Sequence, residues 1–315
     1  MKRSDFMSKK HGNLLITTLA TMFVANKMIN EAAKKRNAIT SDVGQYFDWR
    51  DYRIYYKKKG EGKPLVLIHD LNPISSNYEW SRLEKKLIKN HTVYSIDLIG
   101  CGQSSKPRIT YTNYFFVELI TDFLKEIVKE PADIITSNDS SSFTIMARSL
   151  NPELFQKIIM INPGSCNNNF IANRNNALLR MFLYLPFIGL SFYNYEIREV
   201  NLRETLKTKY FDNPEINQKF IDVYYQTAHS NNSNGRFLYA SIKSNYTNVN
   251  IEKTLKNIAS DLYIIESNEY EEYQTIVNKY EELNRDIKVC YIKNAKKLPH
   301  LEQPEETIKI IETIL

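Results

Sequence analysis

Residues 133–143 read DIITSNDSSSF, and this stretch passes from a buried strand through a short polar turn into a helix. Ile134 and Ile135 have the β-branched character of a strand, whereas the residues from Ser140 onward begin a segment of helical pattern. Glycines normally flank a turn of this kind when it holds a catalytic nucleophile, because they let the backbone reverse sharply. This turn has no glycine, and the whole chain has only nine. The sequence alone leaves open whether the turn is catalytic.

Strand-like and helical stretches alternate on both sides of this turn. Apolar or alternating runs typical of strands occur at 53–58, 65–69, 93–96, 157–162, 262–265 and 289–292. Helical spacing occurs at 80–89, 115–129 and 271–284, and again after Pro304. Such alternation predicts an α/β fold with a mostly parallel central sheet and helices on both faces.

The alternation stops for about ninety residues after Pro163. That interval is rich in Tyr, Phe and Leu and has helical character, so it is interpreted as an inserted helical cap over residues 165–256. The core is then expected to comprise residues 45–164 and 257–315, with residues 1–40 forming a separate N-terminal segment.

Composition argues against several functions. The net charge of +6 is spread along the chain without a basic stripe interleaved with aromatic residues, so nucleic acid is not an expected partner. Cys101, Cys166 and Cys290 are widely spaced and odd in number, which argues against a disulfide framework. Without a CxxC motif or a Cys/His cluster, we expect neither a structural metal nor a cofactor.

Residues 14–25, LLITTLATMFVA, are uncharged and mostly apolar, and basic residues stand on both sides of them. The run is shorter than the roughly 17 to 20 residues that span a bilayer, unless Asn13, Asn26, Met28 and Ile29 are counted as a polar-tolerant extension. A membrane anchor or interfacial helix, a secretory signal peptide and a helix packed on the domain all fit this pattern. The anchor predicts a membrane-associated protein, and the packed helix a cytoplasmic one.

Four further stretches resemble one family. They are LVLIHDLN (65–72), DLIGCGQSSKP (97–107), NPELFQKIIMINP (151–163) and LPHLEQPEE (298–306). Together they resemble the capped members of the α/β-hydrolase family, which include epoxide hydrolases, haloalkane dehalogenases and esterases. The resemblance covers about residues 45–315 and implies the α/β-hydrolase fold with a cap after the sixth strand. It also implies a nucleophile, a histidine base, an orienting carboxylate and two oxyanion-binding amides.

The nucleophile has three candidate positions in the turn. Reading NDSSS (138–142) as the family's G-x-S-x-G makes Ser140 the nucleophile. A register one residue earlier selects Asp139, in the manner of the family's dehalogenases and epoxide hydrolases. Counting back from Pro152 without gaps instead selects Asn138, which is chemically inert. A further interpretation is a polar turn whose serines cap the next helix.

The other catalytic positions depart from the family pattern. Glu269 falls on the position of the orienting acid, although it also fits a solvated loop carboxylate. Lys297 stands where the family has its histidine, and an ammonium is protonated near neutral pH and cannot accept a proton. His300 lies three residues further on and could act as base only if the loop rearranged.

The expected oxyanion and pocket residues are His69, Asp70 and Ser141. Asp70 replaces the family's glycine, so a carboxylate stands near the place where negative charge would develop.

These departures favour a membrane-tethered protein of hydrolase fold that has lost or reduced hydrolase activity. Such a protein would bind a small apolar ligand or a protein partner under its cap. The alternatives are an active hydrolase of esters, lactones, epoxides or halides using Ser140 or Asp139, and a purely structural protein with a filled cavity.

Overall fold

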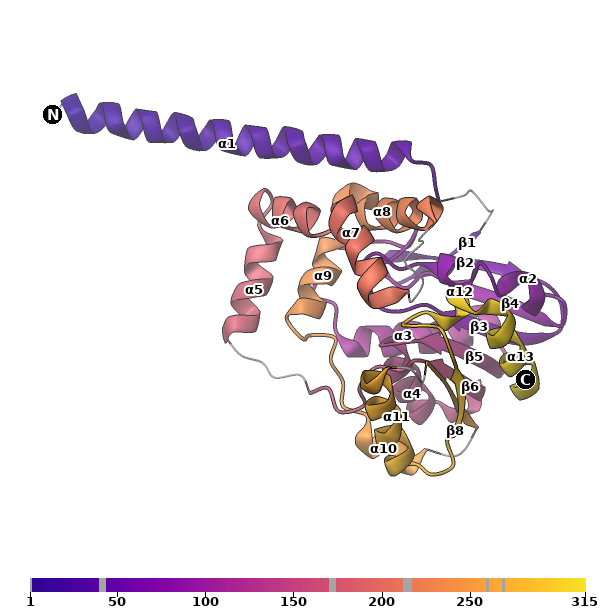
Figure 1. The fold of residues 1–315 in the computed structure, drawn as a ribbon. Coiled ribbons are helices and arrows are strands. Elements are labelled where there is room, and N and C mark those ends of the chain that lie inside the picture. Colours follow the sequence, from indigo (N-terminus) through magenta and orange to yellow (C-terminus); the bar gives the residue numbers. More distant parts are fainter. Residues whose placement is uncertain (1, 40–43, 170–173, 212–216, 259–260, 268–269) are drawn as a thin grey trace.

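The computed structural model describes residues 2–39, 44–169, 174–211, 217–258, 261–267 and 270–315, and Figure 1 shows its ribbon. An eight-stranded sheet in the order β1-β2-β4-β3-β5-β6-β7-β8 forms the centre. Its strands are β1 (Gln45–Trp49), β2 (Tyr52–Lys59), β3 (Lys63–Ile68), β4 (His91–Ile96), β5 (Ala132–Ser137), β6 (Phe155–Ile161), β7 (Leu262–Ser267) and β8 (Lys288–Ile292). Only the pairings of β2 with β1 and β4 are antiparallel. The predicted mostly parallel sheet is confirmed.

Helices follow the strands in the alternation that the sequence predicts. They are α1 (Lys2–Lys35), α2 (Glu84–Leu87), α3 (Asn113–Phe123), α4 (Ser140–Leu150), α5 (Arg174–Tyr184), α6 (Ile188–Glu196), α7 (Glu199–Thr205), α8 (Gln218–Ser233), α9 (Arg236–Lys243), α10 (Glu252–Asn257), α11 (Glu271–Leu283), α12 (Pro299–Glu302) and α13 (Pro304–Ile314). Helices α5 to α10 lie between β6 and β7; α5 to α9 fall within the interval 165–256 predicted as the cap, and α10 ends one residue beyond it.

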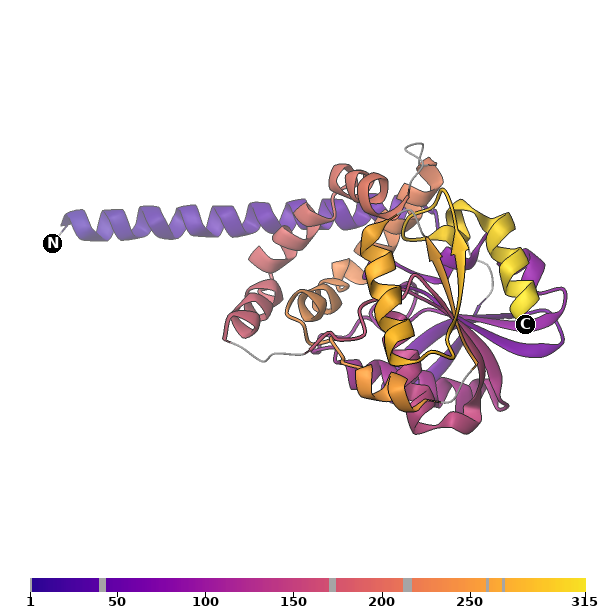
Figure 2. The ribbon, with the colours of Figure 1, turned by 60° about the horizontal axis from the view of Figure 1, so that its bottom comes forward.

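The sheet is buried on both faces, which explains the continuous apolar runs of its central strands. Val66 and Ile68 pack with α3, α4 and α11 on one face, whereas Leu65 and Leu67 pack with α2 and α13 on the other. Figure 2 shows these helical layers from a second direction. The strands are therefore held from both sides, and their carboxyl ends form a rigid edge.

The turn after β4 is organised by one buried carboxylate. Asp97 accepts hydrogen bonds at Oδ1 from the backbone N–H of Asn77 (2.6 Å) and at Oδ2 from that of Gln103 (2.8 Å). Gly102 has φ +46°, and a Cβ there would lie 2.0 Å from Asp97 Oδ2. The motif DLIGCGQSSKP thus marks a turn whose glycine leaves room for the carboxylate.

Helix α1 is joined to the cap along its C-terminal half. Asn26, Asn30 and Ala33 are buried on one helical stripe, and α1 lies beside α6 and α8. Arg36 pairs with Glu199 (2.5 Å) and Asp222 (2.6 Å) just after the helix.

The predicted transmembrane helix at residues 14–29 is not supported. In the described part of the chain, no single helix is long and apolar enough to cross a membrane. Helices α5 and α6, bent by 94° at their junction, meet that length and composition only as a pair.

Candidate functional site

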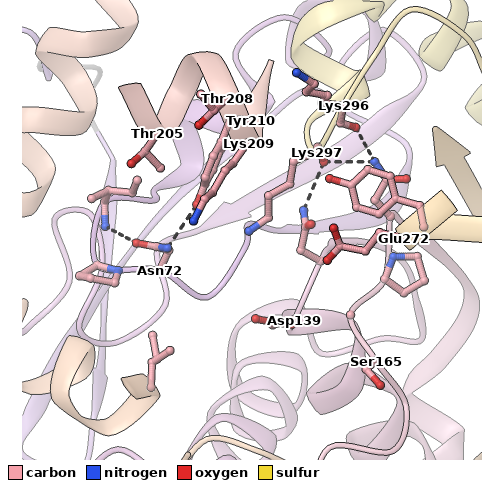
Figure 3. A pocket seen from close by; sticks show the side chains of 18 of the residues that line it. Asn72, Asp139, Ser165, Thr205, Thr208, Lys209, Tyr210, Glu272, Lys296 and Lys297 are labelled. Atoms are coloured by element: carbon pink, nitrogen blue, oxygen red, sulfur yellow. Dashed lines mark hydrogen bonds between the residues drawn. The ribbon is translucent and has the colours of Figure 1, made fainter. Parts of the chain in front are cut away.

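A cavity of about 830 Å³ lies between the cap and the carboxyl ends of the central strands. From the sheet side, residues after β5, β6 and β8 line it, including Asn138, Asp139 and Lys297. The cap contributes Leu202, Tyr210 and other side chains. Figure 3 shows Lys297 reaching into this space between Tyr210 and Asp139. Ligand sites of open α/β sheets lie at this edge, so the cavity is the natural candidate site.

The tip of the turn after β5 is Asn138. Its φ is +50°, in the left-handed region that asparagine tolerates better than most residues. Its backbone N–H donates to the carbonyl of Ile161 (3.0 Å), which extends the strand pairing to the tip. Helix α4 then starts at Ser140. The ungapped register therefore describes the backbone, and neither Ser140 nor Asp139 occupies the tip.

The two serines that follow do not face the cavity. Ser140 is fully buried, and its Oγ donates a hydrogen bond of 2.6 Å to the carbonyl of His69. Ser141 is equally buried, and its Oγ has no hydrogen-bond partner among the described residues. The register that makes Ser140 the nucleophile therefore does not match the backbone, in which Asn138 is at the tip of the turn. Without flanking glycines, the sequence does not indicate at which residue the backbone reverses.

An ion pair joins the two residues that depart most from the family pattern. The Nζ of Lys297 donates to Oδ2 of Asp70 at 2.6 Å. The Asp70 side chain is only 1% exposed, and its other oxygen accepts a long hydrogen bond (3.4 Å) from the backbone N–H of Asp139. The Asp70 carboxylate therefore accepts a hydrogen bond from the Asp139 amide. Because this amide directly follows the tip of the turn, it is the one that would bind an oxyanion in a hydrolase of this fold.

The charges of this cluster set its pKa values. Burial by itself would lower the pKa of Lys297, but the negative charge of Asp70, with smaller effects of Tyr210 and Asp139, raises it well above its usual range. Partial desolvation inside the cavity and the charge of Asp70 raise the pKa of Asp139 to about 6, against the opposing charge of Lys297, although Asp139 itself is exposed to the cavity. Burial and Asp70 also raise the pKa of Glu79 well above its usual range. Lys297 is hence held as a cation, whereas the surroundings of Glu79 disfavour its charged form relative to a glutamate in water.

Side chains missed by the sequence reasoning hold this cluster in place. Asn162 Nδ2 donates to the carbonyls of Lys296 (2.7 Å) and Lys297 (3.3 Å), and its Oδ1 accepts from the backbone N–H of Ser267. Glu79 Oε2 accepts the backbone N–H of Asp70 (2.8 Å). Asn162 could have been predicted as a site residue, because it is a polar residue directly after a buried strand, β6. No feature of the sequence marked Glu79 as a site residue.

Both histidines named from the sequence are structural. His69 Nε2 accepts the backbone N–H of Leu98 (3.0 Å), so the ring proton lies on Nδ1, which bonds the carbonyl of Asp70 (2.7 Å). His300 is fully buried and stacks on Trp80 with ring centroids 4.5 Å apart. Burial lowers its pKa to about 3. It does not line the cavity, which corrects the hypothesis that it serves as base.

Glu269, the candidate for the orienting acid, lies outside the described residues. Among the described residues that line the cavity, none is a histidine or a cysteine. No group of three or more His, Cys, Asp or Glu side chains within the described ranges could hold a metal ion. Next to the turn, the cavity thus presents the carboxylate of Asp139 and the ammonium of Lys297, which is paired with Asp70. Other acidic and basic side chains line the rest of the cavity, namely Glu196, Glu272, Lys209, Lys243 and Lys296.

The titration of Asp139 tests this arrangement of charges. With carboxyl-¹³C aspartate, its resonance should titrate near pH 6 rather than near the usual pH of about 3.9. Lys297→Met should raise that midpoint because it removes a positive charge, and Asp70→Asn should lower it because it removes a negative one. NMR spectra of both folded variants, with Asp139→Asn to assign the signal, give the comparison. A midpoint unmoved by either change would contradict the described cluster.

Comparisons with known proteins agree with this architecture. No family model matches the sequence. An uncharacterized protein of Mycobacterium bovis is 25% identical over 150 residues, covering 44% of this chain and 43% of that protein. A haloalkane dehalogenase of Agrobacterium fabrum is 28% identical over 111 residues (35% and 36%), and a soluble epoxide hydrolase of a Corynebacterium species 26% over 115 (36% and 40%). The chain thus spans less than half the length of these relatives.

Solved structures match much more of the chain. A serine hydrolase involved in carbazole degradation has a TM-score of 0.72 at 15% identity, covering 86% of this chain and 98% of that one. A membrane phospholipase A, described as a bacterial virulence factor, has a TM-score of 0.68 at 17% identity, covering 100% and 98%. At these identities the likeness shows the architecture alone. Sheet order, cap and structural neighbours together establish that this chain has the α/β-hydrolase fold.

Proposed function

We propose that this α/β-hydrolase-fold protein binds an amphipathic small molecule under its cap without hydrolysing it. The observation that carries the proposal is the 2.6 Å ion pair between Lys297 and Asp70. In support of the proposal, this ion pair keeps protonated the amine that the family resemblance aligns with the base, and it holds a carboxylate beside the amide that would bind an oxyanion. Asn138 at the tip has an amide, which is not a nucleophile.

The cavity has the size and lining of a ligand site. Its volume of about 830 Å³ lies within the range of roughly 300–1,000 Å³ that holds small ligands. Ile74, Ile197, Leu202, Ile242 and Ile276 supply apolar surface. Tyrosines, Asp139, Lys297 and further charged side chains supply polar groups; the further charged residues are Glu196, Lys209, Lys243, Glu272 and Lys296. A molecule that has both apolar and polar parts fits this mixed lining better than a purely apolar molecule.

One observation favours hydrolysis as a second candidate function. Asp139 lines the cavity, and with a pKa of about 6 it is mostly ionised at neutral pH. The partial matches to a haloalkane dehalogenase and an epoxide hydrolase suggest alkyl halides or epoxides as the substrates of an attacking carboxylate. Against it, the cavity residues described offer no neutral imidazole to activate the water that must release the product.

Membrane attachment through residues 14–29 forms part of the proposal. Its support is the uncharged apolar run with basic residues on both sides. The structural match to a membrane phospholipase A extends along the whole chain, α1 included.

Ligand binding is tested by filling the cavity. Ile276→Trp puts an indole into space that Ile276 now lines, so it should weaken binding of the neutral fluorescent probe N-phenyl-1-naphthylamine by at least about tenfold. Ile310→Trp makes the same change at a half-buried site on α13 outside the cavity and should bind like the wild type. Fluorescence titration gives both values. Equal affinity of all three proteins would refute the cavity as the binding site.

Catalysis is tested by turnover of aryl esters, terminal epoxides and haloalkanes. We expect wild-type rates equal to those of Asp139→Asn and Ser140→Ala, and no labelling by a fluorophosphonate probe. Circular dichroism verifies that each variant is folded. Wild-type turnover that Asp139→Asn abolishes would establish the hydrolase instead, and labelling that Ser140→Ala abolishes would restore the serine.

A further inference from the structure

Exposed large apolar side chains are concentrated in two segments of the described chain. Six lie on α1 and eight on α5, α6 and their junction, whereas only five are scattered elsewhere. Single exposed apolar residues are ordinary on a protein surface, but concentrations of this kind mark interaction sites.

The start of the apolar run of α1, residues 14–18, is exposed on all sides, whereas Leu19 and Met22 further along are half-buried. Leu14, Leu15 and Ile16 are consecutive and 67%, 61% and 66% exposed. Successive helical residues point 100° apart, so these three cover more than half of the helix circumference. A protein partner would cover one side, whereas lipid surrounds a helix. The twelve residues 14–25 extend about 18 Å, well short of a hydrocarbon core of about 30 Å.

Polar groups on this part of α1 are already satisfied within the helix. The hydroxyls of Thr17, Thr18 and Thr21 donate to carbonyls four residues earlier at 2.8–2.9 Å. Such internal bonding removes the cost of taking a hydroxyl out of water. Lys27, the first charged residue after the apolar run, is exposed and can meet anionic headgroups.

Helices α5 and α6 present a second apolar surface. Met181, Leu185 and Ile188 are 62%, 43% and 45% exposed, and Phe182 and Phe192 are 38% exposed each. Between Arg174 and Glu196 the only charged residue is Arg180. Its guanidinium donates to the hydroxyl of Thr110 (2.7 Å) rather than standing free.

The two surfaces are fixed to each other. Asn26 on α1 donates to Ser191 Oγ on α6 (3.0 Å) and accepts from Asn194 Nδ2 (2.8 Å). In Figures 1 and 2 the N-terminal half of α1 and the α5–α6 pair project at the same end of the molecule. They can therefore meet one surface together.

We propose that the α5–α6 pair is a second lipid contact, which seats the cap on an anionic bilayer surface beside residues 14–29. This rests on the proposed membrane attachment and adds the contact that orients the cavity. Helix α6 ends at Glu196, and both Glu196 and Ile197 line the cavity. The lipid contact therefore borders the ligand site, so an amphipathic ligand can reach it from the bilayer.

The test measures partition of the full chain onto vesicles of phosphatidylcholine and phosphatidylglycerol. The variant Met181→Gln/Leu185→Gln/Ile188→Gln should partition at least about tenfold less than the wild type, because three apolar side chains no longer enter lipid. The variant Leu14→Gln/Leu15→Gln/Ile16→Gln should show a similar loss. A matched control, Tyr114→Gln/Leu150→Gln/Tyr291→Gln, changes three exposed apolar residues elsewhere and should partition normally.

The outcomes separate the two proposals. If only the α1 variant loses binding, residues 14–29 attach the chain and the α5–α6 contact is refuted. If the wild type does not bind vesicles, membrane attachment itself fails. The other occupant of the α5–α6 surface would be a second copy of this chain, which sedimentation velocity without lipid tests. If the wild type is a dimer, and the α5–α6 variant is a monomer that still binds vesicles normally, this surface is an interface between copies and the proposal is overturned.

Discussion

The buried ion pair between Lys297 and Asp70 determines what this site can do. Asp70 is almost entirely removed from solvent, so its charge requires a partner, and the Lys297 ammonium supplies it. Removing either charge alone would leave the other poorly compensated at the base of the cavity. The same pairing keeps Lys297 protonated and directs the second Asp70 oxygen toward the Asp139 amide. Under the proposed function, this one interaction occupies two positions that acyl transfer needs free.

The fold around the pair limits its rearrangement. Asn138 and Asn162 both adopt left-handed backbone conformations at strand ends, and the side chains of both donate to the carbonyl of Lys297. Glu79 fixes the backbone of Asp70 from the opposite side. Under the proposed function, replacing Lys297 by histidine alone would not produce a hydrolase, because Asp70 and Asn138 would still occupy the oxyanion side and the tip.

The sequence was sufficient for seven of the eight strands, because the buried strands are continuous apolar runs and the helices between them have clear periodicity. It did not predict the edge strand β1 (Gln45–Trp49). It also placed Lys297 at the functional edge, through the LPHLEQPEE stretch. It could not fix the tip of the turn, since three registers differ by one residue and no glycine distinguishes them. Nor could it pair Lys297 with Asp70, which are 227 residues apart, or bury His300 against Trp80. Such contacts depend on tertiary packing that local pattern does not encode.

The proposed membrane attachment and the proposed ligand binding would be linked through the cap, since α1 packs on α6 and α8 while α6 leads into the cavity wall. Whether the site can act as a base depends on the protonation of Lys297. Its most direct measurement is the titration of the Lys297 side chain, followed through ¹³Cε of labelled lysine and assigned with Lys297→Arg. The account predicts a signal that stays protonated beyond the usual lysine midpoint of about pH 10.4. A midpoint at or below about pH 8 would mean that Lys297 can act as a base near neutrality, and would contradict it.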